Sequence, residues 1–540
     1  MYIYYLLGVL SVIGTSITVF FISVRNKYKV PIWVIYSLFF VSVYMLVTQY
    51  LKYSSLHFYV DFSHWTQLFY NISDHGRPFS QNVELLKPGT LNYLSVHFVP
   101  FVYILAVPFK VWPYSATIIV LNFLLMASAV IPLYKLALTC NKDKLFALFV
   151  AVLLLWYPTF QYVVLYEFEM LRFSIPIILW MLYFWQKKRM AMYYLFVVLA
   201  VFVREEVGLT IMMFGLYLFF IEKQRRTGFT SSLIGMAAFI IITQIIMPSL
   251  RGGDAYEHIA IGSFSVFGNT ISEVIINVFK KPFLVLETIL QPIKLANVFM
   301  LFLPLLFIPF GASMVLIATL GNFGVGLLSQ SNLHISYMLF YVSPSVPFIF
   351  YAFIKGWPKF LVLLETFFER WVPTLKRGKI DSSARAMVLS GILVANVFFG
   401  PSPISLQFWF KDLRPAPFET QNFHYSVYKI TDHHRAVDEF VRPIPDSAIV
   451  AAPYHLHPRL FKKKGSIIFP RFNAHDDIQK ANYVLIDKTN NGLTESSTVY
   501  RTQRDFDVVE KDKETWELVK SGDGYFLYRR IGNMKKLKGE

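Results

Sequence analysis

The stretch HFYVDFSHWTQLFYNISDHGRPF, residues 57–79, is rich in polar, aromatic and acidic side chains, and it follows two long apolar runs. Each run is long enough to cross a bilayer, so Asp61 is predicted to lie just beyond a membrane-spanning helix. Ionisable groups at or near a membrane are costly and are by default candidates for function. The alternative is that Asp61 is an exposed loop residue that caps the helix after it.

The composition is typical of an integral membrane protein. Of the 540 residues, 55% are hydrophobic and only 16% are charged, whereas about 25% are charged in ordinary globular proteins. Apolar stretches of about 20 residues recur, which indicates a polytopic α-helical membrane protein. The single cysteine, Cys140, excludes an internal disulfide and a cysteine-based zinc site. The net charge of +17 does not indicate a nucleic-acid partner, because much of it lies in short loops between apolar runs.

Lys and Arg in short loops mark the cytoplasmic side of a membrane protein, and here they predict the topology. About twelve helices of roughly 20 residues satisfy a strict alternation of inner and outer loops, in a multi-pass protein of the cell membrane. The predicted cytoplasmic loops are 25–29, 141–144, 186–189, 222–226 and 355–379. The predicted outer loops are 51–113, 166–169, 204–206, 249–295 and the SQSNLH segment that ends at His334.

The run Phe98–Trp112 contains two prolines and a lysine and is short for a span. Counting it as a span would place loop 141–144 outside, so it is predicted to lie along the outer surface as an interfacial helix. A re-entrant arrangement is the alternative. The predicted organisation is two N-terminal helices (1–50), an outer loop with the interfacial helix (51–113), a helical membrane core (114–400), a proline-rich linker (401–417) and a soluble domain (418–540).

The last of these segments, 418–540, has the composition of a soluble protein. SAIVAA (447–452) and YVLID (483–487) are typical of short buried strands, GYFLYRR (524–530) of an alternating edge strand, and HHRAVDEFV (433–441) of a helix. Strands that alternate with helices predict a small α/β domain, which the loop charges place on the extracytoplasmic side.

The unusual polar residues fall at the predicted outer ends of the helices, where they would gather on one side of the membrane. Such a set could act on a polyprenyl-phosphate lipid, because a carboxylate can take a proton from an acceptor hydroxyl and arginine suits the departing phosphate. Carboxylate oxygens also suit Mg²⁺ or Mn²⁺. The predicted catalytic residues, which are also the candidate metal ligands, are Asp61, Glu167 and Glu169; the predicted substrate- and phosphate-binding residues are Arg77, Arg204, Glu205, His64, Gln67, His97, His334 and Tyr337.

Several of these residues have structural alternatives. Glu167 and Glu169 would then be the solvated ends of two helices. Arg204 and Glu205 would form an internal ion pair, and the histidines would be hydrogen-bonded packing residues. The sequence contains no P-loop, no GxGxxG after a strand and no HExxH, so nucleotide-driven chemistry is not expected.

From about residue 50 the sequence resembles a family of bacterial and archaeal membrane proteins known as "domain of unknown function 2079". The opening pattern of that family is approximately YDLGIFDQALWN, followed by a glycine-containing segment. The corresponding stretches here are VDFSHWTQLFYN (60–71) and DHGRPF (74–79), and Thr66 replaces the second acidic residue of the pattern. The positions that match are Asp61, Gln67, Asn71 and Gly76.

Later parts of the family pattern are also matched. Glu169 stands where a histidine is expected. The matching positions are His97 and Phe98; Glu167, Phe168 and Glu169; Arg204, Glu205 and Glu206; and, near the end of the chain, HLHPR with Arg459, ANYVLID with Asp487, and DGYFLYRR with Asp523 and Gly524.

The family is itself similar to the GT-C class of integral-membrane glycosyltransferases. The resemblance implies a GT-C-like fold, a polyprenyl-phosphate sugar as donor, and Asp61 as the general base of an inverting transfer at the outer membrane face. A different hypothesis is a non-catalytic transport or scaffold subunit that binds membrane lipid or a partner through the same outer cavity. In that case Asp61 would be paired with an arginine.

Overall fold

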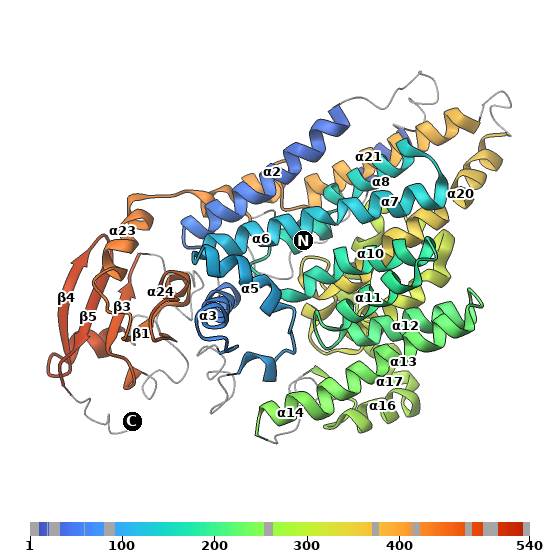
Figure 1. The fold of residues 1–540 in the computed structure, drawn as a ribbon. Helices are drawn as coiled ribbons and strands as arrows, with labels where there is room; N and C mark the ends of the chain where they lie inside the picture. The colour runs from blue at the N-terminus through green and yellow to red at the C-terminus, as the bar shows by residue number, and fades with distance from the viewer. Residues whose placement is uncertain are drawn as a thin grey trace.

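A helical body and a five-stranded sheet make up the chain, and the sheet lies at one end of the body (Figure 1). The computed structural model describes residues 10–18, 20, 33–58, 60–79, 92–252, 263–369, 377–411, 413, 422–469, 478–489 and 506–532. The segment of the two predicted N-terminal helices, 1–50, and the predicted linker, 401–417, lie in part outside these ranges.

Helices dominate the part of the chain before the sheet. The α-helices are α2 (Trp33–Ser54), α3 (Val60–His75), α5 (Val102–Val111), α6 (Ser115–Ser128), α7 (Val130–Asn141), α8 (Lys144–Trp156), α9 (Pro158–Leu165), α10 (Ser174–Gln186), α11 (Met190–Val201), α12 (Val207–Phe220), α13 (Arg225–Ile241), α14 (Met247–Leu250), α16 (Ile271–Lys280), α17 (Pro282–Ile289), α18 (Pro292–Phe302), α19 (Phe323–Leu328), α20 (Val346–Glu369), α21 (Arg377–Phe399) and α22 (Leu406–Trp409). Short 3₁₀ segments join several of them: η1 (Tyr93–Ser95), η2 (Met170–Phe173), η4 (Leu303–Leu305), η5 (Ile308–Gly321), η6 (Asn332–Ile335) and η7 (Phe340–Ser345). A π-helical turn, η3 (Ile242–Ile246), continues α13.

Four helical stretches of the described residues are long and apolar enough to cross a membrane, namely Ser115–Asn141, Arg225–Leu250, Asn332–Phe367 and Gly378–Phe399. The helix pairs α8–α9 and α17–α18 meet the same criterion together but bend by 53° and 62°, so these residues contain up to six spans. The predicted number of about twelve is not confirmed. One reason is that Pro158 and Pro292 begin new helices inside apolar runs, because proline is tolerated at a helix start but not in its interior.

Loops predicted to share the cytoplasmic side lie together. Arg385 forms ion pairs with Asp143 in the α7–α8 turn and with Asp381 in its own helix, α21. Near the end of α10, Trp185 Nε1 donates to Gln224 Oε1 in the α12–α13 loop at 2.9 Å. The basic loops therefore gather in pairs, as a common membrane side requires.

α12 and α13 approach closely through glycine. A Cβ added to Gly208 would lie 2.7 Å from the carbonyl oxygen of Gly235, and one added to Gly215 would lie 2.7 Å from that of Gly228. Small residues at such positions let two membrane helices pack backbone to backbone. This contact fixes the start of α12, and with it the turn formed by residues 204–206.

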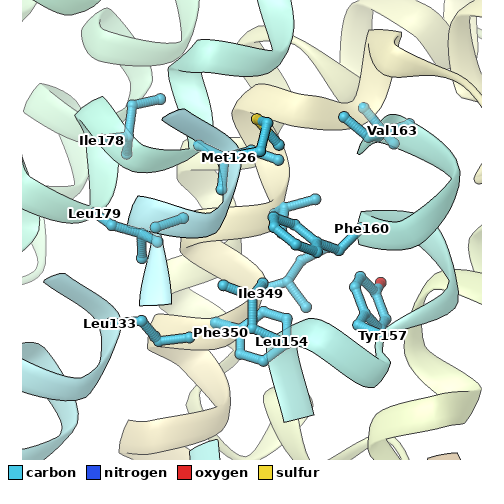
Figure 2. Packing of buried hydrophobic residues seen from close by; sticks show 14 of the residues in the cluster. Met126, Leu133, Leu154, Tyr157, Phe160, Val163, Ile178, Leu179, Ile349 and Phe350 are labelled. Atoms are coloured by element: carbon cyan, nitrogen blue, oxygen red, sulfur yellow. The ribbon is translucent and has the colours of Figure 1, made fainter. Parts of the chain in front are cut away.

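The main hydrophobic core runs through the helical body. Figure 2 shows Phe160 and Val163 of α9 facing Ile178 and Leu179 of α10, with Phe350 of α20 below them. All five side chains are at most 1% exposed, although α20 is far from α9 and α10 in the sequence. The core therefore joins segments predicted to be separate spans.

α5 is the helix predicted to lie in the membrane interface. Its ten residues give a length of about 15 Å, too short to cross a bilayer. Val102, Leu105, Ala106 and Phe109 are buried. Apolar side chains also point outward from this segment: Tyr103, Ile104, Val107, Val111 and Trp112 are 39% to 71% exposed. α5 thus has one apolar face in the protein core and another that is exposed. This agrees with a position in the membrane interface, which remains a prediction.

The C-terminal sheet has the strand order β2-β1-β3-β5-β4. β1 (Ile449–Ala452) pairs in parallel with β2 (Gly465–Ile468) and β3 (Tyr483–Asp487), whereas β5 (Tyr525–Arg530) is antiparallel to β3 and to β4 (Trp516–Gly522). The two predicted buried strands and the helix α23 (Asp432–Val441) are confirmed. The prediction that GYFLYRR is an edge strand is wrong, because β4 pairs with its outer side.

The sheet domain is attached to the helical body near α3. Ser55 Oγ, in the α2–α3 connection, donates to the carbonyl of Val427 at 2.5 Å. Ser115 Oγ, at the start of α6, donates to the carbonyl of Pro458 at 2.6 Å in the short helix α24 (His457–Leu460). Figure 1 shows α3 and α24 side by side between the sheet and the other helices.

Candidate functional site

Asp61 lies in the first turn of α3, with its side chain partly exposed. The backbone N–H of Phe62, in the same turn, donates to Glu167 Oε2 at 2.9 Å. A carboxylate at this position satisfies an N–H that has no partner within the helix, and the helix dipole favours it. Glu167 therefore caps α3, which is the role that the structural alternative gave to Asp61.

Tyr166 orients the Asp61 carboxyl. Its hydroxyl donates to Asp61 Oδ2 at 2.5 Å. Burial and the nearby Glu169 raise the pKa of Asp61 to about 6, against the opposing effects of Tyr166, Arg204 and His97. Within the described ranges, Asp61 forms no ion pair with a lysine or arginine. The carboxylate is therefore ionised above about pH 6 and more basic than an ordinary aspartate.

Arg204 is the centre of a buried charge cluster. Its Nη1 lies 3.3 Å from Glu169 Oε1, and its Nε lies 3.2 Å from Glu206 Oε2 and 3.9 Å from Glu205 Oε1. The Arg204 side chain is only 5% exposed, and a buried charge is tolerated when it is paired. Loops predicted to be outer, 166–169 and 204–206, are thus held together by ion pairs.

His97 completes the cluster from a third predicted outer loop. Its Nε2 lies 3.1 Å from Arg204 Nη2 and its Nδ1 lies 2.8 Å from Glu205 Oε1. A guanidinium can only donate, so Nε2 accepts and the imidazole proton is on Nδ1, where it is donated to Glu205. Glu205 Oε2 also accepts from the N–H of Phe98 at 3.0 Å. Glu205 is therefore a positioning residue that holds the His97–Phe98 backbone and the imidazole.

A cavity of about 260 Å³ opens beside this cluster. Its polar lining comes from His97, Arg204, Glu205, Glu206, His334 and Tyr341, and its apolar lining includes Leu209, Phe239 and Phe264. Asp61 is not part of this lining. Its carboxyl is nevertheless close enough to Arg204 for the charge of that guanidinium to lower its pKa.

His334 and Tyr341 form one wall of the cavity. The two rings are 4.8 Å apart in an edge-on arrangement, and His334 Nδ1 is 2.8 Å from Ser329 Oγ. The Arg204 guanidinium lies 5.8 Å from the centroid of the Tyr341 ring, within cation–π range. His334 therefore lines the same cavity as Arg204, and its role in binding stays a prediction.

Four predicted binding residues lie elsewhere. His64 is buried on the side of α3 that faces His457 of the sheet domain. Gln67 is buried in the middle of α3, and Arg77 is exposed after its end. Tyr337 packs edge-on against Tyr162 at 5.8 Å. Gln67 is six residues after Asp61 and faces another side of α3, because successive residues of a helix are about 100° apart.

Three residues of the site were not among the predicted ones. Tyr166 contacts Asp61, Glu206 pairs with Arg204, and Tyr341 lines the cavity. Glu206 had a usable signal, since it adjoins Arg204 and Glu205. The two tyrosines had none, because the chain contains 32 tyrosines and only the fold selects these two.

The predicted carboxylate metal site does not fit this geometry. Glu167 is engaged by the N–H of Phe62, and Glu169 by the N–H of Met170 and by Arg204. Among the residues that the structure describes, no three His, Cys, Asp or Glu side chains are arranged to hold a metal ion. Asp61, Glu167 and Glu169 are therefore not proposed as metal ligands.

A family model described as "Predicted membrane protein (DUF2079)" matches residues 52–527. Among solved structures, ArnT from Cupriavidus metallidurans bound to undecaprenyl phosphate is similar with a TM-score of 0.49 and 10% identity, over 92% of this chain and 98% of that one. The oligosaccharyltransferase of Archaeoglobus fulgidus, tethered to an acceptor peptide, is similar with a TM-score of 0.40 and 13% identity, over 93% of this chain and 74% of that one. Both similarities are too remote to assign residue roles. No curated protein sequence matches the chain.

Proposed function

The chain belongs to the DUF2079 family of predicted membrane proteins, and on that premise we propose that it is a GT-C-like glycosyltransferase. It transfers a sugar from a polyprenyl-phosphate donor to an acceptor at the outer membrane face, with Asp61 as the general base. The observation that carries the proposal is the Asp61 carboxyl itself. It is partly exposed, oriented by Tyr166, basic because of its surroundings, and next to a cluster of charges beside a cavity.

The chemistry follows from these groups. Asp61 accepts the proton of an acceptor hydroxyl, the hydroxyl oxygen forms a bond to the anomeric carbon, and the bond from that carbon to the phosphate oxygen breaks. The polyprenyl phosphate leaves with the electron pair. Attack opposite to the leaving phosphate inverts the configuration of the sugar. General-base catalysis of this kind contributes about 10²- to 10⁴-fold to a rate.

Arg204 is the group that would stabilise the phosphate, since it lines the cavity and can donate two hydrogen bonds to a phosphate. Its charge is partly neutralised by Glu206 at 3.2 Å. Burial raises the pKa of Glu206 despite the opposing effect of Arg204. Glu206 can therefore take up a proton near neutral pH, which leaves more of the positive charge of Arg204 for an anion in the cavity.

The non-catalytic hypothesis makes a different prediction about Asp61. In a transport or scaffold subunit the carboxylate would be paired with an arginine. The hydrogen bond found for Asp61 instead comes from a neutral phenol, Tyr166, while Arg204 pairs with Glu169 and Glu206. A base must be free to change its protonation state, and this arrangement favours the enzyme.

The test is transfer by the full-length protein in nanodiscs. A panel of undecaprenyl-phosphate-linked hexoses and pentoses, radiolabelled in the sugar, is incubated with the protein and a membrane extract as the source of acceptor. Asp61→Asn should lower the initial rate of label transfer about 10²- to 10⁴-fold. The matched control is Asp74→Asn, an acid on the same helix whose side chain is 52% exposed, and it should transfer at the unsubstituted rate.

Two results would contradict the proposal. One is an Asp61→Asn protein that transfers as fast as the Asp74→Asn control. The other is the absence of transfer from every donor of the panel by an unsubstituted protein whose unfolding midpoint shows that it is folded.

A further inference from the structure

A second cavity, of about 610 Å³, lies between the end of α3 and the sheet domain. One side is formed by Tyr70, Asn71, His75, Arg77 and Phe79, and the other by Asp446, Ser447 and the run Lys462–Lys464. The volume is in the range of sites that take small-molecule ligands. It lies at the junction of two parts of the chain that are far apart in sequence.

The charges of this cavity are mostly positive. Among the described residues that line it, four are Arg or Lys and one, Asp446, is acidic. Asp446 is already engaged, because Lys463 Nζ donates to its Oδ1 at 2.8 Å. Within the part of the chain that the structure describes, no carboxylate pairs with Arg77 or Lys462. Like charges gathered in a hollow repel one another, so an anion bound there would relieve this repulsion.

The arginine is held in place by local structure. α3 ends at His75, and the chain turns at Gly76, whose φ is +68°; Asn71 Nδ2 donates to the carbonyl of Phe79 at 2.6 Å. The Arg77 guanidinium lies 6.0 Å from the centroid of the Phe79 ring. A guanidinium held in this way presents a fork that matches phosphate oxygens.

The lysine side of the cavity adjoins the exposed apolar segment that follows α5. Lys462 Nζ lies 5.6 Å from the centroid of the Tyr114 ring, and Tyr114 and Trp112 are 62% and 68% exposed. Exposed Trp and Tyr beside a lysine are typical of the boundary between lipid and water. The cavity is therefore within reach of a ligand that comes from the bilayer surface as well as one from solution.

The second cavity is separate from the Asp61 site. Tyr70 and His75 are nine and fourteen residues after Asp61 on the same helix, which corresponds to about 14 Å and 21 Å along its axis. A small anion could not occupy both places. A ligand that spans them must be elongated, with its anionic group at the far end of α3.

We infer that this cavity is a binding site for a phosphate-bearing anion, held between Arg77 of the loop after α3 and Lys462 of the sheet domain. The phosphate belongs either to a lipid headgroup or to a soluble ligand such as a phosphorylated glycan. The inference does not depend on sugar transfer at Asp61.

The test follows the reactivity of single lysines in the full-length protein. In nanodiscs of neutral phosphatidylcholine, the rate of acetylation of each lysine by N-hydroxysuccinimidyl acetate is measured by mass spectrometry, with and without inorganic pyrophosphate. Pyrophosphate should slow the acetylation of Lys462 at least about fivefold, whereas sodium chloride at equal ionic strength should not. Lys513, exposed elsewhere on the sheet domain, is the internal control and should react at an unchanged rate.

A variant of Arg77 shows whether Arg77 and Lys462 bind the same anion. Arg77→Gln should raise the pyrophosphate concentration that half-protects Lys462 about tenfold, as expected for the loss of one charge-assisted contact. The inference is overturned if pyrophosphate leaves the acetylation rate of Lys462 unchanged. It is also overturned if pyrophosphate protects Lys462 in the Arg77→Gln variant as well as it does in the unsubstituted protein. Asp61→Asn should leave the protection intact, so failure of the proposed transfer and failure of this site give different results.

The lipid composition of the nanodisc distinguishes the two possible sources of the phosphate. If a headgroup occupies the cavity, Lys462 reacts slowly in nanodiscs that contain phosphatidylglycerol even without pyrophosphate, and Arg77→Gln restores the fast rate. If the ligand is soluble, phosphatidylglycerol has no effect and pyrophosphate still protects. Both outcomes support an anion site between these two residues.

Discussion

The Arg204 guanidinium donates to Nε2 of His97 over 3.1 Å, and this single contact determines where the imidazole proton is. With Nε2 accepting, the proton must be on Nδ1, 2.8 Å from Glu205 Oε1. The order of donors is therefore fixed from Arg204 through His97 to Glu205.

Glu205 should be essential for the stability of this network. Its side chain is 1% exposed and accepts from both His97 and the N–H of Phe98. Glu205→Ala removes the acceptor and part of the charge that compensates Arg204, and we expect it to lower the free energy of unfolding by about 3–5 kcal/mol. Glu205→Gln keeps one oxygen acceptor and should cost less. Denaturant unfolding in detergent measures both; equal losses would show that the hydrogen bonds do not matter.

Tyr166→Phe should change the pH dependence of transfer. The Tyr166 hydroxyl stabilises the ionised Asp61 and so lowers its pKa, which is about 6 with the hydroxyl present. Without that hydrogen bond the pKa should rise by about one unit, since a bond to a charged group contributes about 1.5–3 kcal/mol. The acidic limb of the pH–rate profile should therefore move from near pH 6 toward pH 7. Tyr134→Phe, in α7, is the control, and a profile identical to that of this control would exclude the role of Tyr166.

Asp61 should also affect stability in a pH-dependent way. Its folded-state pKa, about 6, is above the ordinary value of 3.8, mainly because of burial. The folded protein thus holds a proton that the unfolded chain releases, and stability is lost as the pH rises from about 4 through 6. Asp61→Asn removes this loss and should raise the unfolding temperature at pH 8 but not at pH 4. Asp74→Asn should have no such effect, and a decrease at pH 8 for Asp61→Asn would show that the burial of the carboxylate is not costly.

Much of the arrangement was accessible from the sequence through charge. Asp143 and Arg385 lie in or beside loops that the positive-inside pattern assigns to one side, and they form an ion pair. Glu169, Arg204 and His97 come from three loops assigned to the other side, and they form the charge cluster. Loops assigned to the same side therefore contact one another, while the membrane sides and the number of spans stay predictions.

The details of the site needed the fold. Glu167 and Glu169 are two residues apart, yet one caps α3 and the other pairs with Arg204. Arg77 resembles a phosphate ligand in the sequence as much as Arg204 does, but the length of α3 places it at the other end of that helix. Spacing along the chain does not contain this information, because it depends on where each helix begins and how the helices pack.

Gly208→Ala tests whether close packing of α12 and α13 holds the Arg204 turn. The new methyl group would lie 2.7 Å from the carbonyl oxygen of Gly235 and 3.3 Å from the Cβ of Phe239, a residue of the cavity wall. The helices must separate to admit it, which typically costs about 1–3 kcal/mol. We expect a lower unfolding temperature and a slower transfer. Gly378→Ala, where nothing lies within 4 Å of the new Cβ, is the control and should be neutral.

Asp487 should make the stability of the sheet domain depend on pH. Its Oδ2 lies 2.9 Å from His455 Nε2 and 3.2 Å from His433 Nε2, and its side chain is fully buried. Burial opposes the charging of His433, but the hydrogen bond to Asp487 and its charge, together with the contacts to Asp523, outweigh burial and raise the pKa of His433 above 6.5. Stabilisation by protonated His433 is therefore complete below pH 6.5 and is lost as the pH rises through the folded-state value.

Hydrogen exchange of β3 amides in the full-length protein measures this effect. Protection should decrease from pH 6 to pH 8, after correction for the intrinsic rate. Asp487→Asn should lower the opening free energy by about 2–3 kcal/mol at pH 6, and by less at pH 8, because it leaves the charged imidazole without its counter-ion. Asp438→Asn is the matched control, since it lies on the same helix as His433 and its side chain is 58% exposed. If protection in Asp487→Asn follows the same pH dependence as in this control, the His433–Asp487 pair does not control the stability of the domain.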